Sequence, residues 1–142
     1  MKMDKENEYL NKLDVKIHQR FPKAILIQNE VGFKRVNLDY TIKGEFGTLE
    51  LSVLPLKAFE TCSILPQIII EEESQKKYTL DFLLENTQHL RFELERLGFK
   101  KPTRFQAKNE NLVVNFQPKK VDYLFLDNLL EQIYYEYSTY LN

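Results

Sequence analysis

The sequence predicts a single α+β domain over residues 1–142, in which an antiparallel β-sheet is packed by helices. Three observations support this fold class. A chain of 142 residues has the length of one ordinary domain and can bury roughly two thirds of its unfolded surface. Hydrophobic residues make up 43% of it, with only 4 Gly and 5 Pro, which disfavours disorder. Segments with helical and with alternating periodicity follow one another in the order α-β-β-β-(β)-α-β-β-α.

The first helix is predicted from Met3 to Arg20, and Pro22 marks its end. Its apolar residues recur along one helical stripe, at Leu10, Leu13, Ile17 and Phe21. The run that follows, Ala24 to Gln28, is aliphatic and lacks polar alternation. We therefore expect it to form a short buried strand.

Two alternating segments predict a β-hairpin. The first, Arg35 to Ile42, and the second, Thr48 to Val53, place every other residue inward. The inward residues are Val36, Leu38, Tyr40, Ile42, Leu49, Leu51 and Val53. Between them, Lys43 to Gly47 supplies two glycines that can adopt positive φ in a turn.

Two prolines, Pro55 and Pro66, bracket a stretch without a consistent period, and we expect Leu56 to Leu65 to be an irregular crossover. A short apolar strand, Gln67 to Ile70, should follow it. Glu71 to Glu73 would then be the exposed end of that strand, since hard-cation loops space their oxygen ligands around a turning glycine.

A long helix is predicted to begin after Thr79, a plausible N-cap, and to end at Gly98, which suits a C-terminal cap. Its leucines share one face: Leu80, Leu83, Leu84, Leu90, Leu94 and Leu97. Phe82 and Phe92 lie off this face, so another surface has to cover them. That surface is either the Leu56 to Leu65 segment, which contains Phe59, or a partner chain.

The carboxyl-terminal third predicts a second hairpin and a last helix. Thr103 to Lys108 and Leu112 to Gln117 flank a short connection of residues that tolerate the left-handed conformation. The expected buried side of this hairpin consists of Phe105, Ala107, Leu112, Val114 and Phe116. Asp122 can cap the last helix, whose apolar stripe comprises Leu126, Leu129, Leu130, Ile133, Tyr137, Tyr140 and Leu141. Tyr135 lies opposite that stripe.

Composition narrows the classes of function. The net charge of −1 gives no overall attraction to nucleic acid or to an anionic membrane. A single cysteine, Cys62, excludes an intramolecular disulfide and favours a reducing compartment, so we expect a cytoplasmic protein. The amino terminus, Met1 to Glu8, has no apolar h-region, and no stretch approaches the roughly eighteen consecutive apolar residues of a membrane span, so we expect neither a signal peptide nor a membrane-spanning segment.

No set of residues in the sequence matches a catalytic, cofactor-binding or metal-binding constellation. Cys62 could be a nucleophile only beside a base, and the two histidines, His18 and His89, read as surface residues. Asp39 stands on the polar side of an alternating strand, where a solvated sheet face explains it. We therefore expect no enzyme activity and no cofactor.

Two groups of residues are candidates for binding a partner. The first is the aromatic set Phe59, Phe82, Phe92 and Tyr135, which would bind another protein. The second is the basic hairpin, Lys100 to Lys120, with a local net charge of +5, in which Lys100, Lys101, Arg104 and Lys108 could bind a polyanion such as nucleic acid. The second is less favoured, because alternation turns Phe105 and Phe116 inward and basic residues also protect sheet edges.

The element order resembles that of the small chaperones of type III secretion. The local similarity lies at Leu83-Leu84-Glu85-Asn86 and where Leu112 to Gln117 leads through Pro118 into the last helix. Such chaperones are dimers that bind an extended segment of an effector on hydrophobic patches, so the resemblance implies a non-catalytic binder. The longer second helix, the additional strand at Gln67 to Ile70 and the near-neutral charge depart from that family.

Leu49 to Ile70 also resembles ubiquitin-conjugating-type folds, with a strand, a proline-bounded loop and Pro66-Gln67-Ile68-Ile69-Ile70. Cys62 precedes the last strand and is not where such an enzyme needs it, so this resemblance implies an inactive interaction domain. Both resemblances agree with our main hypothesis. It is a non-enzymatic protein-binding domain, chaperone-like or toxin-immunity-like, that binds another protein or forms a homodimer.

Overall fold

The computed structural model describes residues 2–31, 36–56, 60–100, 105–108 and 110–142. It confirms an α+β fold. The strands are β1 (Ile25–Val31), β2 (Val36–Lys43), β3 (Thr48–Leu56), β4 (Thr61–Ile70), β5 (Phe105–Lys108), β6 (Asn111–Asn115) and β7 (Lys119–Asp122). The helices are α1 (Lys2–Arg20), α2 (Glu72–Lys77), α3 (Leu80–Arg96) and α4 (Leu126–Tyr140), with a 3-10 turn, η2 (Tyr123–Phe125), before α4.

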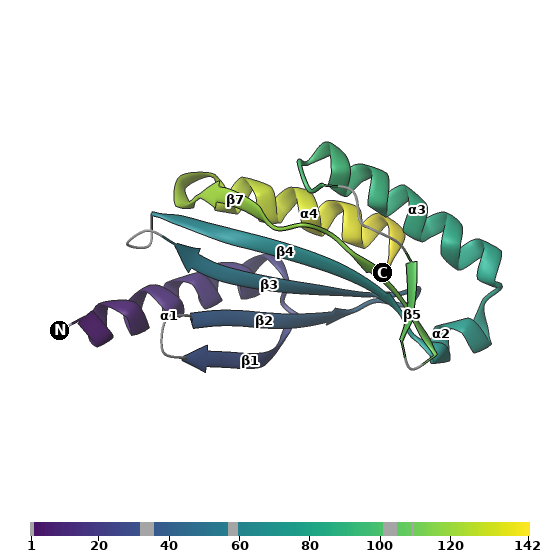
Figure 1. Cartoon of the computed structure of the whole chain (residues 1–142), viewed down its shortest axis with the longest axis horizontal. Helices are drawn as coiled ribbons and strands as arrows, with labels where there is room; N and C mark the ends of the chain where they lie inside the picture. The colour runs from purple at the N-terminus through teal and green to yellow at the C-terminus, as the bar shows by residue number, and fades with distance from the viewer. Residues whose placement is uncertain (1, 32–35, 57–59, 101–104, 109) are drawn as a thin grey trace.

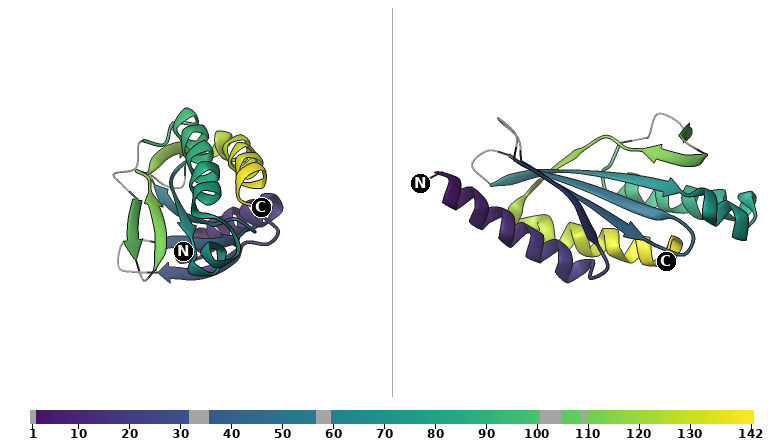
Figure 2. Two further views of the ribbon diagram at one scale, coloured as in Figure 1. Left: turned by 90° about the vertical axis from the view of Figure 1, so that its right-hand side faces the viewer. Right: turned by 90° about the horizontal axis from the view of Figure 1, so that it is seen from below.

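The described strands form one sheet in the order β1-β2-β3-β4-β6-β5, with β7 also paired to β4, and every pairing is antiparallel. The three long helices pack on one face of this sheet, with α4 between α1 and α3 (Figures 1 and 2). The core lies between these two layers. No described helix covers the opposite face.

The first strand differs from its prediction. Ala24 is buried, but Ile25 is 58% exposed and Leu26 is also exposed. The reason is position, since β1 pairs only with β2 and forms one edge of the sheet. The predicted buried strand is therefore a partly exposed edge strand.

The β2–β3 hairpin confirms its prediction, and Leu38, Tyr40, Ile42, Leu49, Leu51 and Val53 are buried. The role of its glycines differs, because neither Gly44 nor Gly47 has a positive φ. A Cβ on Gly44 would lie 2.7 Å from the carbonyl carbon of Leu141 and closer still to its oxygen. That oxygen accepts a hydrogen bond from the Phe46 amide at 2.8 Å, so the glycine makes room for the carboxyl end of the chain.

The predicted crossover from Leu56 to Leu65 is wrong over its described residues. The β3 strand continues through Pro55 to Leu56, and β4 begins at Thr61 and pairs with β3 along its length. Residues 57–59, and with them the candidate Phe59, lie outside the described part. Glu71 to Glu73 also differ, because Glu72 and Glu73 open the short helix α2, where acidic side chains favour the helix dipole.

Pro66 lies inside β4, a central strand, and the way that β4 pairs with its neighbours explains why a proline is tolerated there. On its second edge, β4 pairs with β7 through Thr61 to Ile64 and with β6 through Gln67 to Ile70. Leu65 and Pro66 therefore have no partner on that edge, and Pro118 lies in the segment that joins β6 to β7. A sheet tolerates proline where the ladder is interrupted. The β7 strand was not predicted, and Asp122 ends it without capping α4.

The α3 helix confirms both predicted caps. The Thr79 side chain accepts a hydrogen bond from the Phe82 amide, and Gly98 has φ 103. Backbone hydrogen bonds from Gly98 to Glu95 and from Phe99 to Leu94 close a Schellman motif. The leucine face is buried at Leu83, Leu90 and Leu94, but Leu80 is exposed, and Leu84 and Leu97 are half-buried.

The second hairpin and the last helix largely agree with prediction. Val114 and Phe116 are buried, whereas Ala107 is exposed and Leu112 is half-buried; the side chain of Phe105 lies outside the described part. In α4 and just after it, Leu126, Leu129, Leu130, Ile133, Tyr137 and Leu141 are buried. The Tyr137 hydroxyl donates to the Lys43 carbonyl at 2.8 Å, which ties α4 to the β2–β3 hairpin.

Candidate functional site

The most exposed apolar side chains gather on the α3, η2 and α4 side of the molecule. Six described residues of this kind are more than half exposed: Val15, Ile25, Phe92, Leu124, Phe125 and Tyr135. The last four belong to α3, η2 and α4, and they are 51%, 88%, 61% and 67% exposed, respectively. These four residues therefore belong to the helical layer of the molecule.

A groove runs between the outer sides of α3 and α4, two helices that lie side by side (Figure 1). Its main hollow has a volume of about 490 Å³ and is lined by Glu93, Arg96, Leu97, Glu131, Gln132, Tyr135 and Glu136. A second hollow of about 250 Å³ shares Arg96, Leu97 and Gln132 with it and continues to Phe125, Asn128, Leu129, Lys119 and Val121. We call the two together the α3–α4 groove.

The charges of the α3–α4 groove are unequal. Arg96 contacts the Glu93 carboxylate at 3.3 Å, and Glu131 pairs with Arg20 at 3.6 Å. Glu136 makes no hydrogen bond or ion pair with a described residue. Burial and the nearby Glu93 hold the pKa of Glu136 above its ordinary value, while Arg96 opposes the rise. The groove therefore contains a carboxylate that lacks a direct cationic partner among the described residues.

At the end of the groove near η2, Lys119 has a structural role. Its ammonium group donates to the Leu97 carbonyl at 2.5 Å, at the carboxyl end of α3, where a cation satisfies the free carbonyls and the helix dipole. This contact places β7 and η2 beside the end of α3. Phe125 consequently lines the groove although it is remote from α3 in the sequence.

The predicted partner-binding residues are placed as follows. Phe92 and Tyr135 are exposed on α3 and α4, and Tyr135 lines the groove. Phe82 is exposed by 40%, and its ring contacts Phe46 and Tyr78, with centroids 5.2 and 5.9 Å away. Phe82 is thus partly covered by the β2–β3 turn and by Tyr78, away from the residues that line the groove.

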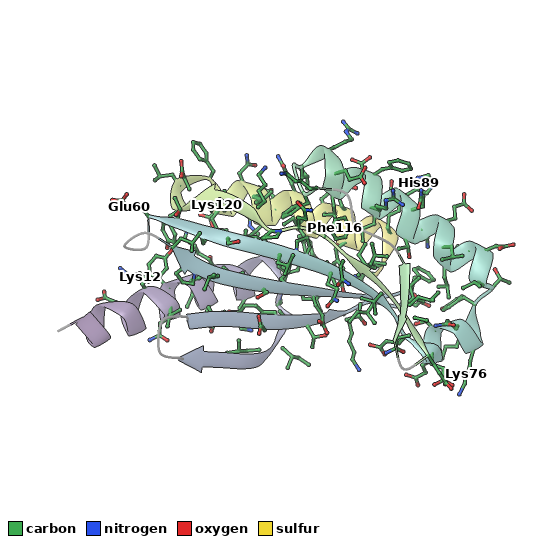
Figure 3. All side chains as sticks on the ribbon, viewed as in Figure 1. Lys12, Glu60, Lys76, His89, Phe116 and Lys120 are labelled. Atoms are coloured by element: carbon green, nitrogen blue, oxygen red, sulfur yellow. The ribbon has the colours of Figure 1, made fainter. Side chains whose placement is uncertain are left out.

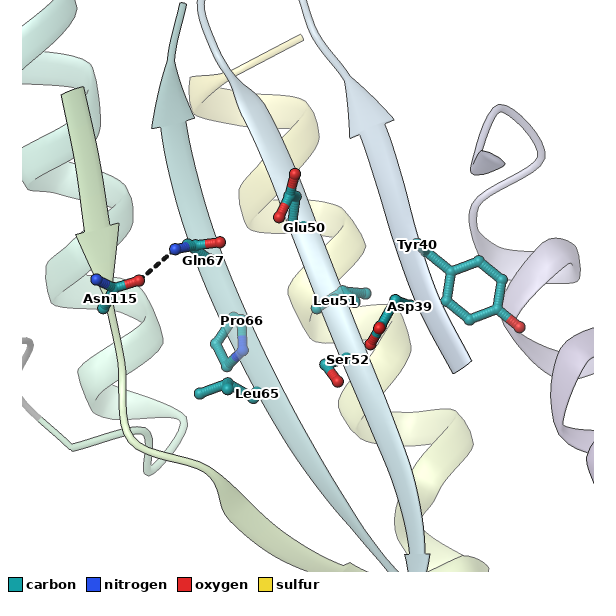
Figure 4. A pocket seen from close by; sticks show the side chains of 9 residues that line it. All are labelled: Asp39, Tyr40, Glu50, Leu51, Ser52, Leu65, Pro66, Gln67 and Asn115. Carbon is teal, nitrogen blue, oxygen red and sulfur yellow. Dashed lines mark hydrogen bonds between the residues drawn. The ribbon is translucent and has the colours of Figure 1, made fainter. Parts of the chain in front are cut away.

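A separate hollow lies on the face of the sheet that no described helix covers, and we call it the sheet-face hollow (Figure 4). It has a volume of about 410 Å³ and is lined by Asp39, Tyr40, Glu50, Leu51, Ser52, Leu65, Pro66, Gln67 and Asn115. The Gln67 amide donates to the Asn115 side chain. Its polar side chains suit hydrogen bonding to a polar ligand, but the exposed aromatic residues are on the other layer.

Cys62 does not have the features of a catalytic nucleophile. It is fully buried in β4, and burial raises the pKa of its thiol to about 11. Its β-sheet partners are Pro55 and Val121. The histidines have other contacts. The two ring nitrogens of His18 lie 3.1 Å from the carbonyl oxygens of Asp14 and Ala24, and His89, on α3 (Figure 3), stacks on Tyr140 of α4.

The basic hairpin offers less than its sequence indicates. Lys100 and Lys120 are exposed, and Lys120 lies on β7 (Figure 3). Lys101 and Arg104 lie outside the described residues, as does the side chain of Lys108. Phe116 is buried and cannot stack on a base, and Lys119 is bound to α3.

Sequence reasoning missed Leu124, Phe125 and Glu136. The first two belong to the beginning of the last helix in the sequence prediction, whereas in the structure they are exposed on the 3-10 turn that precedes α4. Glu136 is one of many carboxylates in the sequence, and only the packing of α3 against α4 places it in the groove. The helical phase of Phe92 and Tyr135 was a sufficient signal for those two residues.

Comparisons of the chain with models of protein families, with curated proteins and with solved structures give no significant match. Within the part of the chain that is described, no three His, Cys, Asp or Glu residues are grouped as metal ligands. None of the described helices is long and apolar enough to cross a bilayer.

Proposed function

We propose that this protein is a non-enzymatic binding domain that recognises another protein through the α3–α4 groove. The observation that carries the proposal is the position of its exposed aromatic residues. Phe125 and Tyr135 are more than half exposed and line one elongated groove, and Phe92, also more than half exposed, lies on α3 in the turn that precedes the lining residue Arg96. Aromatic residues are enriched where proteins bind one another, because they bury a large area at a small entropic cost.

The remaining features are consistent with this function. Cys62 is buried and protonated at neutral pH, which suits a structural thiol in a reducing, cytoplasmic setting. The resemblance of the element order to secretion chaperones, which are binders, also favours the proposal. A second copy of the chain is the alternative partner, and light scattering of the purified protein distinguishes the two.

The proposal is tested by comparing two double variants. The groove variant, Phe92→Ser with Tyr135→Ser, removes one aromatic residue that lines the groove and one that is exposed on α3. Val15→Ser with Ile25→Ser is the matched control, since these residues are similarly exposed on α1 and β1. A protein captured from native cells by the wild type is identified, purified and titrated against all three proteins. We expect the groove variant to bind at least about tenfold more weakly and the control to match the wild type.

Equal binding by the groove variant would contradict the proposal, and so would an equal loss in the control. Urea denaturation of each variant provides the check on folding. Because all four side chains are exposed, we expect their unfolding midpoints to stay close to that of the wild type.

A further inference from the structure

We propose that the partner enters the α3–α4 groove with a basic amphipathic segment, whose arginine or lysine lies between Glu93 and Glu136. Its apolar residues would contact Tyr135 and Phe125. This inference rests on the proposed function, and it specifies the chemistry of the partner.

The balance of charge favours a cation from outside. The main hollow is lined by three carboxylates, Glu93, Glu131 and Glu136, and by one guanidinium, that of Arg96. Arg96 is engaged by Glu93, and Glu131 is engaged by Arg20 from α1. At the other end of the groove, Lys119 is bound to the Leu97 carbonyl. The described basic residues that line the groove therefore already have carboxylate or carbonyl partners, and Glu136 forms no ion pair with any described residue, although the charge of Arg96 acts on it from a distance.

The positions of Glu93 and Glu136 make this imbalance local. The two residues belong to facing helices and line the same hollow. Each raises the negative potential at the other, and the pKa of Glu136 is raised first by burial and then by the charge of Glu93. A cation from the partner would be attracted by both, whereas a carboxylate or phosphate would be repelled.

The aromatic residues favour a segment that also carries apolar side chains. Tyr135 lines the main hollow, and Phe125 lines its continuation beside Leu129. Aromatic faces attract arginine and lysine and also bury apolar side chains. A segment with basic and apolar residues can satisfy both kinds of contact at once.

The shape of the groove suits a segment better than a compact ligand. The two hollows share Arg96, Leu97 and Gln132, so together they form a continuous depression along two adjacent helices. An amphipathic helix or an extended segment that lies along such a groove places successive side chains into it. The basic residue would occupy the main hollow, and apolar neighbours would reach toward Phe125.

Two synthetic peptides test this inference. Both carry the same leucine pattern; one has lysine and arginine at its polar positions, and the other has glutamate. We measure their binding by fluorescence anisotropy at low and at high salt. We expect the basic peptide to bind more tightly, with an affinity that falls as salt rises.

Matched variants locate the charge. Glu93→Gln with Glu136→Gln should weaken binding of the basic peptide about tenfold. Glu72→Gln with Glu73→Gln makes the same charge change on the exposed helix α2 and should leave the affinity unchanged. Because the pKa of Glu136 is raised, its ionised form disfavours the folded state, so Glu136→Gln should not lower the urea midpoint.

The inference is overturned if both peptides bind equally, if neither binds, or if the α2 control weakens binding as much as the groove variant. Titration of the purified native partner separates the two proposals. Loss of its binding with Phe92→Ser and Tyr135→Ser, but not with the glutamine variants, would retain the groove and reject the basic segment. If neither pair of substitutions weakened binding of the native partner, both the groove and the basic segment would be rejected. If the protein assembled with itself through the groove, the occupant would be a second copy of the chain and not a basic segment of a partner.

Discussion

Gly44 illustrates a requirement that arises from a remote part of the chain. Its φ is not in the left-handed region, so the turn itself does not need a glycine. The carbonyl group of Leu141 occupies the space that a Cβ would take, and it also accepts a hydrogen bond from Phe46. A residue that reads as a turn signal in the sequence therefore allows the chain end to lie against the hairpin.

Gly44→Ala should lower the free energy of unfolding by about 2 kcal/mol, because backbone atoms of Leu141 and Gly47 have to move. Urea denaturation measures the change. Gly47→Ala is the matched control and should cost less, since its Cβ would meet the Leu141 side-chain carbon Cδ2 at 2.9 Å, the end of a flexible group. An equal cost at both positions would contradict this explanation.

Cys62 provides a second test at this scale. Because its thiol is buried and protonated at neutral pH, a thiol reagent should modify the native protein only as fast as the protein opens. Reaction with Ellman's reagent, followed with and without urea, measures this. Rapid modification of the native protein would show an accessible thiolate and would reopen the possibility of nucleophilic chemistry at Cys62.

Among the elements, α3 depends on its carboxyl-terminal cap. Gly98 has φ 103 and lies between the end of α3 and Lys119, whose ammonium group binds Leu97. Gly98→Ala should therefore lower the free energy of unfolding by about 1 kcal/mol. Gly98→Asn is the matched comparison and should lose less, because asparagine adopts the left-handed conformation more readily than alanine. If urea denaturation gave equal losses of free energy of unfolding for both variants, the added Cβ atom, and not the positive φ of residue 98, would be the cause.

The elements also show what sequence patterns could and could not predict. The alternation around Leu38 and Leu51 and the caps of α3 were predictable, because each depends on local chemistry. Pro55 and Pro66 misled, because proline usually interrupts strands, and the gap between β6 and β7 opposite Pro66 is a property of the assembled sheet. The same limit applies to the site. Helical phase identified Phe92 and Tyr135 as exposed, whereas the proximity of Glu93 to Glu136 depends on the packing of α3 against α4 and cannot be predicted from the sequence.

For the whole molecule, buried acids with raised pKa values predict sensitivity to alkali. Burial raises the pKa of Cys62 from 9.0 to about 11, and burial also raises the pKa values of Tyr40 and Tyr137. A raised pKa in the folded state means that stability is fully present below the unfolded pKa and is lost as the pH rises above it. The free energy of unfolding should therefore stay level up to about pH 9 and then fall by up to about 1.4 kcal/mol per pH unit for each group.

Urea denaturation at a series of pH values measures this decline, and Cys62→Ala serves as the comparison. The variant should lose less stability between pH 9 and pH 11, because in the wild type the thiol ionises in the unfolded state and stays protonated in the folded state over that range, and alanine has no such proton to lose. A free energy of unfolding that stayed level through pH 11 would contradict the assigned burial of these groups.

The most direct test of the central claim, that the α3–α4 groove binds the partner, is amide chemical-shift mapping of the isotope-labelled protein by NMR. The basic amphipathic peptide is added in steps. We predict that the largest shifts fall on Glu93 and Arg96 of α3, on Gln132 and Glu136 of α4, and on Phe125. Shifts centred instead on the β1 edge, on the sheet-face hollow or on the acidic start of α2 would contradict the account.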